Sequence, residues 1–171
     1  MSAAKLSQDG IFKGKGDYNR QSLRLKAKQV INDKFSLEGN LYFAKINMNM
    51  IQRGSNVAGL LLAGWRSPAD YSNWPYLNDA GWHVSYRNQN PDDEFESRGF
   101  DNPYFIMNEH TANSEVGRTI GNFNIDYDPF DWLNVKYTFG ADYSLDERLT
   151  VLPPGNSSQP GGYVDRLDYI T

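Results

Sequence analysis

Hydrophobic and polar residues alternate with a period of two along four segments of the chain, at about residues 18–31, 35–48, 116–127 and 132–145. Successive side chains of a β-strand point to opposite faces of a sheet, so this alternation predicts strands with one apolar and one polar face. In the last segment Leu133, Val135 and Tyr137 share one face, and Asn134 and Lys136 share the other. Each segment is long enough to cross a membrane as a tilted strand.

The connections between these segments are of two kinds. Residues 32–34 and 128–131 are short polar turns, the second with Pro129 at a position where its fixed φ favours a turn. The connection at about residues 50–115 is far longer than usual, and a second long loop begins near residue 146 and contains the Pro/Gly-rich stretch 153–162. Short turns at one edge and long loops at the other are typical of outer-membrane barrels.

The pattern therefore predicts an all-β fold, an antiparallel transmembrane β-barrel segment of two long hairpins with long extracellular loops. A soluble antiparallel sheet with one wet face would show the same alternation. The polar faces carry eight charged residues, which a dry core would not hold unpaired. They are Arg24, Lys26, Lys28, Glu38, Arg118, Asp126, Lys136 and Asp142. They favour a water-filled or plug-filled lumen over an ordinary solvated sheet face.

Composition agrees with a strand-based membrane protein. Hydrophobic residues make up 39% of the chain and charged residues 22%, which is too apolar for a disordered chain and too polar for a helical membrane protein. The mean hydropathy is −0.66, and the longest apolar run, Val57 to Trp65, is too short for a spanning helix. The strands of a barrel average out as polar, so these values do not count against one.

Charge and cysteine content exclude several classes of function. The net charge is −4 and no basic block occurs, so nucleic acid is not an expected partner. There is no cysteine, which excludes disulfides, zinc–thiolate sites and a cysteine nucleophile. The first residues lack the apolar region of a signal peptide, and residues 163–171 end in a strand-like run. We expect both ends to be cuts through a longer protein.

The long loop at about residues 50–115 is rich in aromatic, amide and carboxylate side chains. Aromatic rings stack on sugar faces and peptide side chains, and the polar groups can bond hydroxyls. The candidate ligand-binding residues are Trp65, Trp74, Tyr76, Trp82, Tyr86, Asp70 and Asn73. The alternative is that the loop aromatics pack into a small core of the loop's own.

Other candidate chemistry in the sequence is weak, and we expect no catalysis, no metal and no cofactor. The acidic run at residues 91–96 could bind calcium but lacks the spacing of an EF-hand, so a solvated loop is preferred. His83 and His110 are the only histidines, and we interpret them as plain loop residues because no catalytic serine motif accompanies them. Gly10 to Gly16 lacks the order of a phosphate-binding loop.

Several stretches, in their order and spacing, resemble the SusC/RagA family of TonB-dependent outer-membrane receptors of Bacteroidetes-type bacteria. They are residues 18–25, 32–40, 53–57, 102–105 (Asn-Pro-Tyr-Phe), 117–127, 131–133 and 140–143. The resemblance implies that residues 1–171 are a fragment of a 22-stranded barrel. Such a receptor imports oligosaccharides or peptides together with a SusD-like lipoprotein lid, and it is energised by the TonB complex. The sequence departs from the complete family pattern in having no plug domain, no TonB box and no carboxypeptidase-like leader domain.

The resemblance also implies a location in the outer membrane and places the loop at 50–115 next to ligand or lid. Two other interpretations stay open at this point. One is a soluble β-sandwich carbohydrate-binding module with the aromatic loop as its platform. The other is a structural or surface β-protein without a small ligand.

Overall fold

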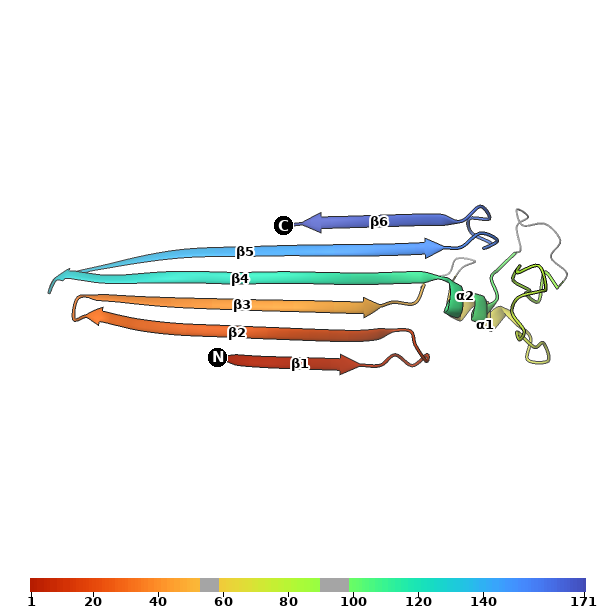
Figure 1. The fold of residues 1–171 in the computed structure, drawn as a ribbon, viewed down its shortest axis with the longest axis horizontal. Helices are drawn as coiled ribbons and strands as arrows, with labels where there is room; N and C mark the ends of the chain where they lie inside the picture. Colours follow the sequence, from red (N-terminus) through yellow and green to blue (C-terminus); the bar gives the residue numbers. More distant parts are fainter. Residues whose placement is uncertain (53–58, 90–98) are drawn as a thin grey trace.

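The computed structural model describes residues 1–52, 59–89 and 99–171, which form one open antiparallel sheet and two short helices (Figure 1). Each strand pairs with its neighbours in sequence, so the strand order is β1-β2-β3-β4-β5-β6. The strands are β1 Ser2–Gln8, β2 Asp17–Asn32, β3 Phe35–Asn49, β4 Thr111–Phe130, β5 Leu133–Leu152 and β6 Tyr163–Ile170. The helices are α1 Leu60–Arg66 and α2 Pro103–Glu109.

The all-β, antiparallel fold class predicted from the sequence is confirmed. β2 and β3 match the predicted segments 18–31 and 35–48 to within a residue. The sheet of the described residues is not closed, because β1 and β6 are its edges. Closure into a barrel is therefore not shown by residues 1–171 themselves.

β4 and β5 are longer than predicted, and β1 is an additional strand. β6 lies in the strand-like run at residues 163–171, which was not counted among the four predicted strands. β4 begins at Thr111, so the predicted loop at 50–115 ends five residues early, and β5 continues to Leu152 beyond the predicted end at 145. In the strand residues beyond the predicted ends, polar or small side chains occupy both faces, as at residues 111–115 and 146–148. Alternation is invisible there, and the strands form because a neighbouring strand supplies backbone partners.

Both tight turns lie at the same end of the sheet. The first is Asp33–Lys34, as predicted, and the second is Asp131–Trp132, whereas the sequence predicted a turn at 128–131. β4 continues to Phe130 through a register shift between Tyr127 and Phe130. A bulge leaves a residue outside the hydrogen-bond ladder, so Pro129, which lacks an N–H, is accommodated within the strand.

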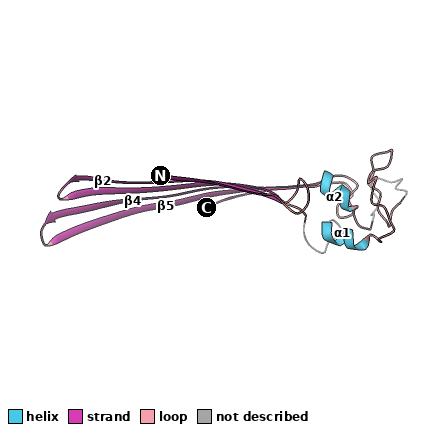
Figure 2. Cartoon of the chain, turned by 90° about the horizontal axis from the view of Figure 1, so that it is seen from below, coloured by secondary structure: helices cyan, strands magenta, loops and turns pink. Residues whose placement is uncertain are grey.

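One face of the sheet carries an exposed apolar surface near the tight turns, which we call the apolar belt. The cross-strand register places its members on one face: Leu23, Leu25, Leu37, Leu41, Phe43, Phe123, Ile125, Tyr127, Leu133, Val135, Tyr137, Phe139, Tyr143 and Leu145. Most are large and well exposed, and Phe139 is 60% exposed. No second layer of the described residues covers the belt, and Figure 2 shows the sheet as a single layer.

The opposite face over the same span is polar and is crossed by pairs between neighbouring strands. Lys26 Nζ lies 3.0 Å from Glu38 Oε1 and Lys136 Nζ lies 3.7 Å from Asp126 Oδ1. Arg118 and Asp142 form a third pair through two guanidinium nitrogens. These six side chains are among the eight charges noted in the sequence, and they remain accessible to water on this face.

The helices lie beyond the end of the sheet opposite the tight turns (Figure 2). Leu60 and Ala63 of α1 pack with Ile106 of α2 to form a small core. Phe12, Ile51 and Met107 are packed against it. α2 begins where Asn102 accepts a hydrogen bond from the Tyr104 N–H and Pro103 occupies the first turn. No helix of the described residues is long and apolar enough to cross a membrane.

Candidate functional site

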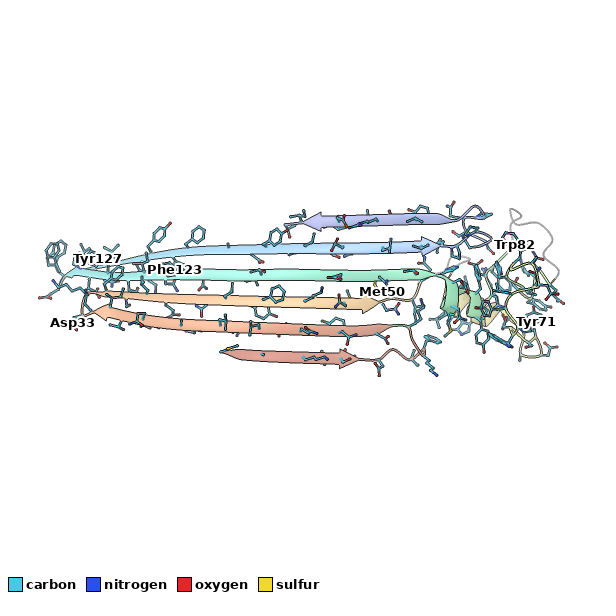
Figure 3. All side chains as sticks on the ribbon, viewed as in Figure 1. Asp33, Met50, Tyr71, Trp82, Phe123 and Tyr127 are labelled. Atoms are coloured by element: carbon cyan, nitrogen blue, oxygen red, sulfur yellow. The ribbon has the colours of Figure 1, made fainter. Side chains whose placement is uncertain are left out.

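The two long connections meet at one end of the sheet and form what we call the outer cap, residues 50–52, 59–89, 99–110 and 153–162. Most of the loop aromatics lie in it, as the labelled Tyr71 and Trp82 illustrate in Figure 3. The two connections are joined directly, because the backbone N–H of Ser157 donates to Asp101 Oδ1 at 2.6 Å. The cap is thus an ordered structure with contacts across 56 residues of sequence.

Three aromatic rings of the cap form what we call the Trp74 cluster. The ring centroids of Trp74 and Tyr76 are 5.3 Å apart, and those of Trp74 and Tyr104 are 5.7 Å apart with the rings edge to face. Trp74 is 61% exposed and Tyr104 43%. The Tyr76 hydroxyl donates to Glu109 Oε1 at 2.9 Å, and burial, with help from Glu109, raises the pKa of Tyr76. The cluster presents an accessible aromatic surface beside a carboxylate.

Tyr86 belongs to a separate pair with Tyr71. Their ring centroids are 5.5 Å apart in an edge-to-face arrangement, and Tyr86 is also exposed. Burial raises the pKa of Tyr71, the inner member of the pair. The structure therefore divides the predicted aromatic set into smaller groups.

The remaining predicted site residues differ in their exposure and in their contacts. Trp65 is 82% exposed on α1 and stacks on no ring among the described residues. Asp70 is exposed. Asn73 is already engaged, since its Oδ1 accepts from the Ser67 hydroxyl at 3.0 Å and its carbonyl accepts from Asn102.

Trp82 packs against the second loop of the cap. Gly155, which has a φ of +82°, lies so close that a Cβ on it would meet Trp82 Cε3 at 3.1 Å. Trp82 also lies in a tight turn, where its backbone N–H donates to Asn78 Oδ1 at 2.8 Å. These contacts assign Trp82 a structural role in joining the two loops.

The histidines are not plain loop residues, and this interpretation from the sequence is wrong. His83 and His110 lie on either side of Asp101, and all three side chains are buried. His83 Nε2 is 3.3 Å from Asp101 Oδ1, and His110 Nε2 is 3.6 Å from Asp101 Oδ2. The Phe105 ring stacks on His83 at 4.5 Å and meets His110 edge to face at 5.3 Å. The cluster ties α2 to both loops of the cap.

The surroundings of His110 in this cluster favour its neutral imidazole. Burial lowers the pKa of His110 to about 4, against the smaller opposing effect of Asp101. No ring nitrogen of either histidine has a well-formed hydrogen bond among the described residues, and Asp101 Oδ2 has none either. Burying polar atoms without hydrogen bonds costs free energy, so close packing around the cluster must offset this cost.

The chemistry available at this cluster is limited. A serine nucleophile would need a hydrogen bond to histidine, but the buried Ser157 Oγ makes none within the described residues. Among these residues no group of three or more His, Cys, Asp or Glu side chains is arranged to hold a metal ion. The arrangement can respond to protons and can hold segments together.

Two stretches of the chain on which predictions were based lie outside the described residues. One is the acidic run 91–96, considered for calcium. The other is residues 53–57, which contribute to the SusC/RagA resemblance. Comparison of the sequence with protein-family models and with curated proteins finds no match.

Proposed function

We propose that residues 1–171 are part of the barrel of an outer-membrane importer of the SusC/RagA type. Such a receptor binds oligosaccharides or peptides and admits them under a SusD-like lipoprotein lid. The TonB complex would act through a plug domain, which is not part of residues 1–171. One observation carries the proposal: over the same span of strands, one face is apolar and exposed while the other is charged.

The energetics of the belt support lipid as its cover. Exposed apolar surface costs about 25 cal/mol per Å² in water, so a surface of this size needs a partner. Along β5 the belt runs from Leu133 to Leu145, about 40 Å at the rise of a β-strand. A tilt of about 45° reduces this to about 28 Å across the membrane, close to the hydrophobic height of outer-membrane barrels.

Aromatic residues at the tight-turn end also support the proposal. Phe130 and Trp132 stack with ring centroids 5.6 Å apart, and Trp132 is 80% exposed. Phe35 and Tyr127 form a second pair at 6.1 Å. Barrels place aromatic girdles where hydrocarbon gives way to head groups, because such rings have an apolar body and Trp and Tyr a polar tip.

The soluble β-sandwich module explains the observations less well. A sandwich covers its apolar face with a second sheet, and the described residues form only one sheet. The charged face over the same strands is also better suited to a wet lumen than to a packed interface.

The membrane proposal is tested by the requirement for detergent. We expect the protein to sediment with outer membranes and to stay monodisperse after extraction only in detergent. Two edge strands and the apolar belt would drive aggregation in plain buffer. Size-exclusion chromatography with light scattering measures this. A cooperatively melting monomer in buffer without detergent would contradict the proposal.

The Trp74 cluster is the proposed ligand-contacting surface of the cap, with a glycan as the first candidate cargo and a peptide as the second. We expect Trp74→Ala, in the membrane-inserted protein, to weaken oligosaccharide binding by roughly two- to tenfold, the value of one aromatic contact. Titration against panels of linear oligosaccharides and of short peptides measures the effect.

Trp65→Ala is the matched control, because Trp65 is at least as accessible as Trp74 but stacks on no ring among the described residues. Its affinity should match the wild type. Equal losses in the two variants, or none in either, would remove the Trp74 cluster from the binding site.

A further inference from the structure

The Trp74 cluster combines two features that a positively charged ligand uses. Its rings meet at steep angles, 53° between Trp74 and Tyr76 and 77° between Trp74 and Tyr104, so they do not bury their faces against one another. Ring faces attract cations that lie within about 6 Å of the ring centroid. The Glu109 carboxylate accepts the hydrogen bond of the Tyr76 hydroxyl and is exposed, so a negative charge borders the cluster.

The charge of Glu109 is not balanced by a basic side chain. No Lys or Arg of the described residues forms an ion pair with it. Lys15 Nζ approaches the same end of α2 but donates to the His110 carbonyl, at 2.8 Å. Glu109 is the last residue of α2, and the last turn of this helix contains no basic residue. The C-terminal end of a helix carries a partial negative charge, so a carboxylate there is unfavourable until a cation joins it.

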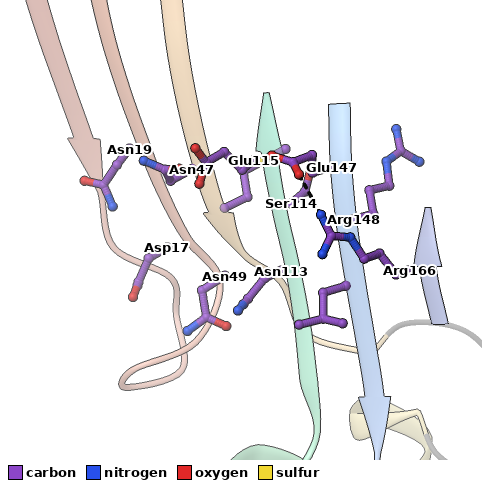
Figure 4. A pocket seen from close by; sticks show the side chains of 12 residues that line it. Asp17, Asn19, Asn47, Asn49, Asn113, Ser114, Glu115, Glu147, Arg148 and Arg166 are labelled. Atoms are coloured by element: carbon purple, nitrogen blue, oxygen red, sulfur yellow. Dashed lines mark hydrogen bonds and ion pairs between the residues drawn. The ribbon is translucent and has the colours of Figure 1, made fainter. Parts of the chain in front are cut away.

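A polar hollow at the cap end of the sheet shows the opposite arrangement (Figure 4). It has a volume of about 510 Å³ over β2 to β6, and its two glutamates are paired, Glu115 with Lys45 and Glu147 with Arg166. A carboxylate that already has a cation offers little to a charged ligand. Glu109 has no such partner among the described residues, so its carboxylate is open to a ligand cation.

The distribution of charge along the chain favours the same kind of ligand. Residues 50–110, the connection that contains the Trp74 cluster, include eight Asp and Glu residues and four Lys and Arg residues. This excess equals the net charge of −4 of the whole chain, so the charges of the other residues balance. In the described part of the connection, Arg66 lies 5.9 Å from the centre of the Phe100 ring and the Arg87 side chain lies against Gly99. A negative surface attracts cationic ligands and repels anionic ones.

We propose that the Trp74 cluster selects glycans whose sugars carry a free, protonated amine. This inference rests on the proposed function, in which the cluster is the ligand-contacting surface of the cap. Trp74 is 61% exposed, and such an open ring suits the broad face of a sugar. The ammonium group of the stacked sugar would donate to the Glu109 carboxylate. An N-acetylated sugar can make the stacking contact but not the ion pair, and an acidic sugar would be repelled.

The test compares two probes, a linear oligomer of glucosamine and the fully N-acetylated oligomer of the same length and linkage. Both are titrated against the membrane-inserted protein in one buffer, in which the amines are protonated. We expect the wild type to bind the glucosamine oligomer about tenfold more tightly, the combined effect of a charge-assisted hydrogen bond and a cation–π contact. Added salt should reduce this difference, because salt screens exposed charges.

Glu109→Gln is the variant, because it removes the charge and keeps an acceptor for the Tyr76 hydroxyl. It should bind the glucosamine oligomer about tenfold more weakly than the wild type does, and the N-acetylated oligomer equally well. Asp79→Asn is the matched control, since Asp79 is an exposed carboxylate of the cap outside the Trp74 cluster. This control should leave the affinity for both oligomers unchanged.

Equal affinity of the wild type for the two oligomers would overturn the amino-sugar proposal, and so would an unchanged preference in Glu109→Gln. If Trp74→Ala still weakens binding, the cluster remains the ligand-contacting surface and only the choice of ligand is wrong. A lysine peptide that binds as tightly as the glucosamine oligomer, with the same dependence on Glu109, would overturn the assignment to a sugar. Binding of neither oligomer would also overturn it, and the requirement for detergent would then test the importer proposal independently.

Discussion

Replacing Phe139 by lysine is expected to destabilise strongly the membrane-inserted state that we propose for the protein. Phe139 lies in the middle of the apolar belt, opposite Phe123 of β4. A lysine at the midplane of a lipid-facing barrel strand costs about 2 to 4 kcal/mol. That is a large share of the stability of a typical protein, about 5 to 15 kcal/mol. The urea concentration at the unfolding midpoint should therefore fall clearly.

The measurement is the urea-induced unfolding of the protein in lipid vesicles, with the mobility of unheated samples in gels as a second readout. Thr138→Lys is the control, because Thr138 is the adjacent residue and points to the charged face. It loses only the hydrogen bond from its hydroxyl to Asn124 Oδ1, about 1 kcal/mol. If the two lysines cost the same, the belt does not face hydrocarbon.

Replacing Asp101 by alanine is expected to open the outer cap while the sheet stays folded. The substitution leaves the buried Ser157 N–H without its acceptor and removes the carboxylate between His83 and His110. One buried donor without a partner costs about 1 to 3 kcal/mol, and the cavity and the two imidazoles add to it. Together these effects should cost roughly 3 kcal/mol or more.

Hydrogen exchange at residues 153–162 and 99–110 measures the opening. Asp101→Asn keeps an acceptor for Ser157 and should restore part of the protection, whereas Asp70→Ala, at an exposed position, should leave exchange unchanged. Uniform loss of protection through β3 and β4 would show that the cluster supports the whole fold instead of the cap.

The same cluster predicts that acid loosens the cap. The pKa of His110 is about 4 in the folded cap, against 6.5 in an unfolded chain. Between these values the unfolded cap binds a proton that the folded cap excludes, so cap stability falls as pH is lowered from about 6.5 to about 4. Exchange corrected for its intrinsic pH dependence should rise over this window, and less so in His110→Gln.

Much of the sheet could be predicted because its signal is local. The alternation in residues 35–48 identifies β3 and also assigns Leu37 and Glu38 to opposite faces, which the structure reproduces. The strand extensions could not be predicted in this way. Residues 111–115 are strand because residues 147–151 of β5 pair with them, and residues 47–49 of β3 pair with 113–115 on the other side. Their own composition would also suit a loop.

The candidate site could be predicted only in part. The richness of the loop in aromatics indicated a ligand surface, but not that Trp74 and Tyr76 would meet Tyr104, nor that Trp82 would be used against Gly155. Nothing in the sequence distinguished Asp101, because its role depends on two histidines that lie 18 residues before it and 9 residues after it.

The sequence by itself determined four of the six strands of the described residues, and the two faces of each. Strand periodicity is a property of adjacent residues, and the choice between an apolar and a charged face requires no knowledge of the partner strand. Only the tertiary structure decided the strand register, and with it which side chains of neighbouring strands lie opposite one another. It also decided the burial of His83, Asp101 and His110, because burial depends on how distant segments close over one another and not on the residues themselves.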